Sequence, residues 1–190
     1  MSINLMTELL TTGKPPFTHR DPAERLEAMW AVSADRWFDK DAVERLKANT
    51  SDEQYSAKID RYLEKCGYTI KRFTLPGSPL DRYGHKNASD WTVFEYKLVH
   101  NTLAHCCNGP AHGLFITDAK HENLIAALRA GFKYTYLVYL VLADDETKYD
   151  LYMFNKYALS KVTQAKLNNR HGISIDPTLY EYKPRTTITL

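Results

Sequence analysis

The chain has 190 residues, a formal net charge of +2 and an isoelectric point near 8.3. Apolar residues make up 44% of it and charged residues 25%, a balance typical of a globular domain and unlike a disordered or low-complexity chain. This length accommodates a complete hydrophobic core, so we expect a single domain over 1–190. The small net charge is compatible with a nucleic-acid partner but does not by itself indicate one.

The three cysteines form no disulfide framework, which favours a reducing, cytoplasmic location. The N-terminal residues lack the basic start and apolar run of a signal peptide. The most apolar segment, 134–143, is too short to span a bilayer, so we expect no membrane partner.

The first third of the chain predicts helices. One begins at Asp21-Pro22, a second covers 39–48, and a third begins at the capping box 51–54 and ends at Gly67. We interpret 1–50 as a helical N-terminal subregion that offers a homodimer contact, with core packing as the alternative. The apolar side chains concerned are Leu5, Met6, Leu9, Leu10, Met29 and Trp30.

The remaining segments alternate between strand and helix patterns. Strands are predicted at 68–75, 91–99, 114–117, 134–142 and 148–154, with a last strand from 179 onwards, and helices at 120–130 and 156–167. The segment 134–142 is apolar almost throughout, which is typical of a strand buried on both faces. The order of elements predicts an α/β (α+β) fold in which helices flank a mixed sheet.

The strand at 91–99 carries the residues that indicate chemistry. Phe94 and Tyr96 lie on one face, which we expect to be the core face, and Glu95 and Lys97 share the other. Metal-assisted phosphodiester hydrolysis needs a carboxylate beside an ammonium group. The carboxylate binds a hard divalent cation, and the ammonium orients or helps to deprotonate the attacking water. The alternative is a solvated strand face with a surface ion pair.

A metal site of this kind needs a second carboxylate, and two aspartates are candidates. Asp90 precedes Glu95 by five residues, which is about 16 Å along an extended strand. Asp81 precedes it by fourteen, and a hairpin centred on Ala88 would place it opposite Glu95, where cross-strand neighbours lie about 5 Å apart. We therefore favour Asp81 and keep Asp90 as the alternative.

With Pro79-Leu80-Asp81 and Glu95-Tyr96-Lys97, the sequence resembles the PD-(D/E)XK nuclease superfamily. The resemblance implies that Asp81 and Glu95 bind Mg²⁺, with Mn²⁺ as a substitute, that the Tyr96 carbonyl completes the site, and that Lys97 assists the water. It also allows Asp60 or Glu64 of the third helix to point at the metal. The family has Pro directly before the Asp, where this chain has Leu80.

The run 75–77 and the polar element around His121 are similar to those of small type II restriction endonucleases of the PvuII kind. This implies a restriction-endonuclease-like core and a homodimer that cleaves double-stranded DNA. We expect four residues near the start of the helix after the metal strands to contact DNA, the alternative being an ordinary capped helix start. They are Thr117, Lys120, His121 and Asn123.

Three further features remain open. A second Glu-Tyr-Lys triplet at 181–183 is set aside because only seven residues follow it. The His and Cys residues of 100–112 could form a zinc site or a loop that approaches DNA. The basic stretch 156–171 could meet phosphates.

The sequence thus predicts a Mg²⁺-dependent endonuclease for double-stranded DNA, in the first place a type II restriction enzyme. The alternatives are a recombination or repair nuclease of the same superfamily and a non-catalytic nucleic-acid-binding module.

Overall fold

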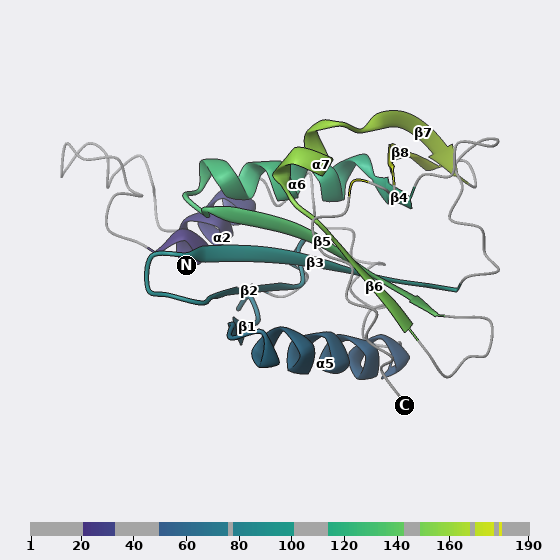
Figure 1. The fold of residues 1–190 in the computed structure, drawn as a ribbon. Helices are drawn as coiled ribbons and strands as arrows, with labels where there is room; N and C mark the ends of the chain where they lie inside the picture. The colour runs from purple at the N-terminus through teal and green to yellow at the C-terminus, as the bar shows by residue number, and fades with distance from the viewer. Residues whose placement is uncertain are drawn as a thin grey trace.

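The computed structural model describes residues 21–32, 50–75, 78–100, 114–142, 149–167, 170–176 and 179. Within them, helices flank a mixed sheet, which confirms the predicted α+β class (Figure 1). The helices are α2 (Pro22–Val32), α5 (Thr50–Lys65), α6 (Asp118–Arg129) and α7 (Lys156–Ser160). The strands are β1 (Thr69–Lys71), β2 (Arg82–His85), β3 (Trp91–His100), β4 (Leu114–Thr117), β5 (Tyr134–Leu142), β6 (Tyr149–Phe154), β7 (Thr163–Leu167) and β8 (Arg170–Ile175).

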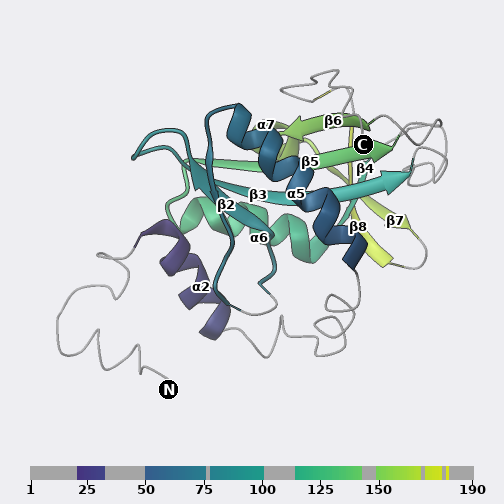
Figure 2. The same ribbon diagram turned by 90° about the horizontal axis from the view of Figure 1, so that it is seen from below.

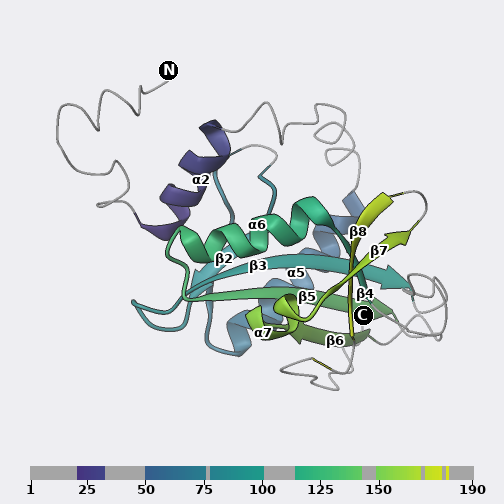
Figure 3. The same cartoon turned by 90° about the horizontal axis from the view of Figure 1, so that it is seen from above.

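The larger sheet has the strand order β1-β2-β3-β5-β6. Its two longest strands, β3 and β5, are parallel, whereas the other pairs are antiparallel. Parallel neighbours need a crossover connection, and the chain between β3 and β5 includes α6, which runs back over one face of the sheet (Figure 3). A second, three-stranded sheet has the order β4-β8-β7 and lies on the α6 side (Figure 1).

Helices cover both faces of the larger sheet. On one face α5 packs against Phe94, Tyr96 and their neighbours on β5 and β6 (Figure 2). On the other face α6 and α2 pack against Val93 and the opposite side of β5 (Figure 3). The expectation of a single core face on β3 is therefore wrong, because α6 buries the face that carries Glu95 as well.

The observed helix ends agree with the local sequence signals. The Asp21 carboxylate accepts a hydrogen bond from the Glu24 amide at 2.9 Å, which caps α2. Gly67 follows α5 with φ of +90°, and Gly131 follows α6 with φ of +102°. Side chains with a Cβ rarely adopt these angles, so glycine ends both helices at low cost.

Two predicted elements differ from the structure. The strand predicted at 68–75 is only β1, Thr69–Lys71. The helix predicted at 156–167 is the short α7 followed by β7, because Thr163–Leu167 pairs with β8 in an antiparallel hairpin. Gly172 of β8 lets the neighbouring strand approach closely, since a Cβ there would lie 2.2 Å from the Ile116 carbonyl oxygen.

Several predictions fall outside the described residues. They are the helix at 39–48, the N-terminal apolar residues before 21, the strand from 179 onwards and the second Glu-Tyr-Lys triplet. Trp30 is buried under α6, so core packing rather than a dimer contact describes it. The boundaries of the domain stay a prediction. Among the described helices, none combines the length and apolar character needed to cross a membrane.

Candidate active site

The β2–β3 hairpin brings Asp81 to the position expected from the sequence. Arg82 pairs with Phe94 at the start of β2, and continuing this register by one residue places Asp81 opposite Glu95. The Asp81 Oδ2 accepts a hydrogen bond from the Tyr96 backbone N–H at 2.7 Å. The Asp81 carboxylate therefore lies against the peptide bond that joins Glu95 to Tyr96.

Glu95 is a fully buried carboxylate in the middle of β3. Neither of its oxygens accepts a hydrogen bond of ordinary geometry from the described residues. Its one ionic contact there is with the Lys120 ammonium group of α6, which lies against Oε1. A buried carboxylate costs considerable free energy unless cations and donors compensate it, so Glu95 has unused capacity to bind a cation.

Tyr96 contributes its main chain to the site and its side chain to the opposite face. Its N–H faces β2, and in an antiparallel pair the carbonyl of the same residue faces the same neighbour. The Tyr96 carbonyl thus points to the edge where Asp81 lies. Its hydroxyl donates a hydrogen bond to Asp60 at 2.8 Å. Burial, and then the nearby Asp60 charge, raise the pKa of Tyr96, so its hydroxyl stays protonated.

A buried ion pair supports this edge from the α5 side. The Arg82 Nε donates to both carboxylate oxygens of Asp60 at 3.1 Å, and its Nη1 donates to the Asp81 carbonyl at 2.9 Å. Arg82 therefore links α5 to the backbone of Asp81. The Asp60 carboxylate accepts hydrogen bonds from Arg82 and Tyr96, and the Glu64 side chain is exposed. The expectation that one of them points at the metal is therefore not met.

Lys97 lies two residues beyond Glu95 on β3, and the alternation of the strand places it on the same face. It is half-buried and makes no ion pair with a described residue. Without an ion-pair partner in the described part of the chain, its ammonium can contact a water molecule or a phosphate.

Asp90, the alternative ligand, lies at the other end of the strand. Residues 91–95 are extended, as expected, so Asp90 is remote from Glu95 along the strand. Its carboxylate contacts Lys133 Nζ at 2.6 Å and Asn87 Nδ2 at 3.0 Å. These hydrogen bonds, that from Lys133 foremost, lower the pKa of Asp90. The geometry therefore favours Asp81 over Asp90 as the second carboxylate beside Glu95.

The four residues predicted to contact DNA have four different environments. Thr117 precedes α6 but makes no capping hydrogen bond with its side chain. Lys120 contacts the buried Glu95 carboxylate. His121 Nε2 lies 2.8 Å from the Leu159 carbonyl of α7, which ties the two helices together.

Asn123 is a core residue. It is 2% exposed, its Oδ1 accepts a hydrogen bond from Trp30 Nε1 at 2.8 Å, and its Nδ2 donates to the Ala119 carbonyl at 2.8 Å. Its amide is not free to meet a base edge in this position. No sequence pattern separates such a core asparagine from an exposed one, because the partner on α2 is 93 residues away.

The oxygen donors at this edge suit a hard divalent cation. Asp81 and Glu95 supply carboxylates, Tyr96 supplies a carbonyl, and Glu95 has buried oxygens without hydrogen-bond donors. No group of three or more His, Cys, Asp or Glu side chains that could hold a metal occurs in the described part of the chain, so this edge offers two carboxylates and one carbonyl. The His and Cys residues of 101–112 lie outside the described residues.

The sequence matches no protein-family profile, and no curated protein matches it. Among solved structures, the chain is similar to Hjc, a Holliday junction resolvase from the archaeal hyperthermophile Archaeoglobus fulgidus. The two share 13% sequence identity at a TM-score of 0.49, over 72% of this chain and 92% of Hjc. The roles proposed for the site residues depend on the geometry given above and not on this likeness.

Proposed function

We propose that the chain is a metal-dependent DNA endonuclease of the PD-(D/E)XK superfamily, with Asp81, Glu95 and Lys97 as its catalytic residues. The observation that carries this proposal is the buried Glu95 carboxylate, which accepts no hydrogen bond from the described residues and has Asp81 across the hairpin. A surface ion pair, the alternative interpretation of Glu95 and Lys97, would leave Glu95 in contact with water. Glu95 is instead fully buried.

Each residue has a distinct role in this proposal. Asp81, Glu95 and the Tyr96 carbonyl hold Mg²⁺, for which Mn²⁺ substitutes. The bound ion supplies Lewis-acid activation of the phosphodiester. Lys97 orients the attacking water or helps to deprotonate it, and its charge offsets that of the phosphate. Arg82 and Asp60 keep the Asp81 backbone in register with Tyr96.

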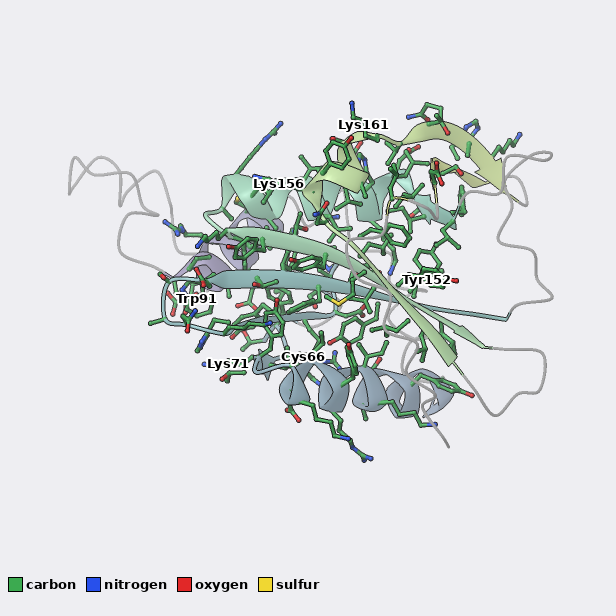
Figure 4. All side chains as sticks on the ribbon, viewed as in Figure 1. Cys66, Lys71, Trp91, Tyr152, Lys156 and Lys161 are labelled. Atoms are coloured by element: carbon green, nitrogen blue, oxygen red, sulfur yellow. The ribbon has the colours of Figure 1, made fainter. Side chains whose placement is uncertain are left out.

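A basic surface on the α6 side supports DNA as the substrate. Lys156, Lys161 and Lys166 are exposed, and the segment 151–167 contains no acidic residue. Lys156 and Lys161 lie on the side of the molecule opposite α5, near α6 (Figure 4). His121 joins α6 to α7, so this surface adjoins the helix that carries Lys120. Lysines spaced in this way can contact successive phosphates.

At a finer level we propose a homodimeric type II restriction endonuclease, because a twofold dimer places one active centre on each strand of a palindromic site. A recombination or repair nuclease is the second candidate. Hjc, the similar structure, is a Holliday junction resolvase, so a four-way junction belongs among the test substrates.

The test is cleavage of a plasmid, a linear duplex and a synthetic four-way junction by the purified chain, with Mg²⁺, Mn²⁺ or EDTA. We expect divalent-dependent cutting that Lys97→Ala abolishes. Lys133→Ala, at a lysine between α6 and β5 that pairs with Asp90, leaves the cutting unchanged. Site-specific plasmid fragments support the restriction enzyme, and preference for the junction supports the recombination nuclease. Unchanged cutting by Lys97→Ala removes Lys97 from the mechanism. Salt-dependent DNA binding without cleavage in any divalent ion supports the non-catalytic module instead.

A further inference from the structure

The Lys120–Glu95 pair joins a buried residue to a partly exposed one. Lys120 lies in the first turn of α6, and its ammonium contacts Glu95 Oε1. The Glu95 side chain has no exposed surface, whereas 36% of the Lys120 side chain is exposed. Glu95 therefore cannot leave the site, but Lys120 has an open path to solvent.

We propose that Lys120 is an exchangeable counter-ion: it neutralises Glu95 in the metal-free protein and releases it when a divalent cation binds. This inference rests on the proposed function, in which Glu95 is a metal ligand. The released ammonium then becomes available to a phosphate of bound DNA. Lys120 would thus couple metal binding to DNA binding.

The need for a counter-ion explains why Lys120 lies where it does. A cation in the first turn of a helix is unfavourable for the helix itself, because it faces the positive end of the helix dipole. The favourable partner is the buried Glu95, whose oxygens accept no hydrogen bond from a described residue. A buried carboxylate left without any cation destabilises the protein by more free energy than a solvent-exposed ion pair contributes to stability.

The same contact explains why Lys120 must move. Lys120 lies against the carboxylate oxygen that a metal ion would use, and two cations at one oxygen repel each other strongly in a buried site. Lysine has a long flexible stem, so its ammonium can rotate towards solvent while its backbone stays in α6. Metal binding and the Lys120–Glu95 contact therefore exclude each other.

The first experiment measures Mn²⁺ affinity of the full chain without DNA, from the electron paramagnetic resonance signal of free Mn²⁺. We expect Lys120→Met to bind Mn²⁺ about tenfold more tightly than the wild type, within the usual range of coupling between two ligands. Lys133→Met, which removes a lysine from the surface pair with Asp90, serves as the matched control and leaves the affinity unchanged. Glu95→Gln abolishes binding at this site.

The outcomes separate the inference from the proposed function. Unchanged or weaker binding by Lys120→Met, while binding still requires Glu95, overturns the role of Lys120 alone. Absence of Glu95-dependent Mn²⁺ binding in the wild type overturns both. Lys120→Gln repeats the test with a polar side chain.

A second measurement uses the wild-type chain, so it does not depend on the folding of a variant. An amine-acylating reagent labels exposed lysines, and mass spectrometry follows each site. We expect Mn²⁺ to increase the labelling rate of Lys120 several-fold and to leave that of Lys133 unchanged. An unaltered rate at Lys120 shows that it stays on Glu95 and contradicts the exchange.

A third measurement tests the coupling to DNA in a Lys97→Ala background, which prevents cleavage. We expect Lys120→Met to weaken duplex binding about fivefold with Mn²⁺ and to have no effect in EDTA, where Glu95 already neutralises Lys120. An equal effect under both conditions means that Lys120 contacts DNA without exchange, and no effect under either removes it from DNA binding.

Discussion

Two carboxylates, Asp90 directly before β3 and Glu95 within it, each pair with a lysine from another part of the chain, and the two pairs differ in burial and in hydrogen bonding. Asp90 pairs with Lys133 where the strand begins, at the surface, with Asn87 as a second donor. Glu95 pairs with Lys120 in the middle of the strand, where helices cover both faces and no described residue donates a hydrogen bond of ordinary geometry to the carboxylate. The Asp90 carboxylate has hydrogen-bond donors and lies at the surface, whereas the buried Glu95 carboxylate has oxygens that can still bind a cation. Burial without hydrogen-bond donors, not the presence of an ion pair, distinguishes the carboxylate that we propose as a metal ligand.

The contrast between Glu95 and Asp90 would be wrong if substitutions at the two residues had equal effects on DNA cleavage. We expect Glu95→Gln to reduce divalent-dependent DNA cleavage by at least about a hundredfold, as loss of a principal electrostatic group does in other active sites. Asp90→Asn is the matched control and should cut at the wild-type rate, since the Asp90 carboxylate is engaged by Lys133 and Asn87 at the start of β3. Initial cleavage rates at saturating Mg²⁺ provide the measurement. Equal losses in the two variants would return Asp90 to the metal site.

A third ion pair, Asp60 with Arg82, sharpens the comparison because it is buried but fully hydrogen-bonded. Asp60→Asn leaves the buried Arg82 guanidinium without its charge partner. We expect this change to lower the free energy of unfolding by about 2 kcal/mol. This value is at the low end for a buried pair because the Asp60 side chain is partly exposed. Glu64→Gln, an exposed change on the same helix, should alter it by less than about 0.5 kcal/mol. Urea denaturation measures both. A stable Asp60→Asn variant would show that α5 is held by apolar packing alone.

A neutral buried contact tests whether burial alone makes a residue of α6 functional. Asn123→Ala removes the acceptor of the Trp30 indole N–H, and we expect a loss of about 1–2 kcal/mol in the free energy of unfolding. DNA affinity of the folded variant should stay at the wild-type value. Glu122→Ala, the exposed neighbour, is the control for both measurements. A selective loss of DNA binding by Asn123→Ala would restore the base-contact role predicted from the sequence.

The smallest effect is expected at the surface pair. The hydrogen bond from Lys133, and then that from Asn87, lower the pKa of Asp90, so Lys133→Met should raise it towards the ordinary aspartate value. Because the folded-state pKa is the lower one, the pair stabilises the fold at neutral pH. This contribution is lost as the pH falls below the ordinary aspartate pKa and through the lowered pKa of Asp90. Carboxyl chemical shifts followed through an acid titration measure the change. An unchanged Asp90 pKa in the variant would mean that Asn87 and the strand end set it.

Local patterns predicted much of the fold. Caps and glycines marked both ends of α5 and the end of α6, and the apolar run over β5 predicted its exact extent because every residue of that run carries the same signal. The hairpin register followed from the polar turn around Ala88, which lies midway between the paired residues Arg82 and Phe94. The β7–β8 hairpin was missed because its basic and polar residues carry no alternation strong enough to outweigh a helical pattern.

The candidate site was only partly predictable. Asp81, Glu95 and Lys97 were named from residue type and spacing, and the structure places Asp81 against the Glu95–Tyr96 peptide bond. The role of Lys120 was assigned to DNA, because its distance from Glu95 in the sequence conceals their contact. The contact between Asn123 and Trp30 is hidden for the same reason, since Trp30 lies on another helix.

The sequence by itself determined the strand that carries Glu95 and Lys97, the hairpin that returns Asp81 to it, and the mixed α+β class, since all of these follow from short-range periodicity and turn chemistry. The tertiary structure alone decided which face of β3 is dry and which cation neutralises Glu95. Those two properties arise when α6 packs across the sheet, and the burial of a charge depends on every element that covers it rather than on its neighbours in the chain.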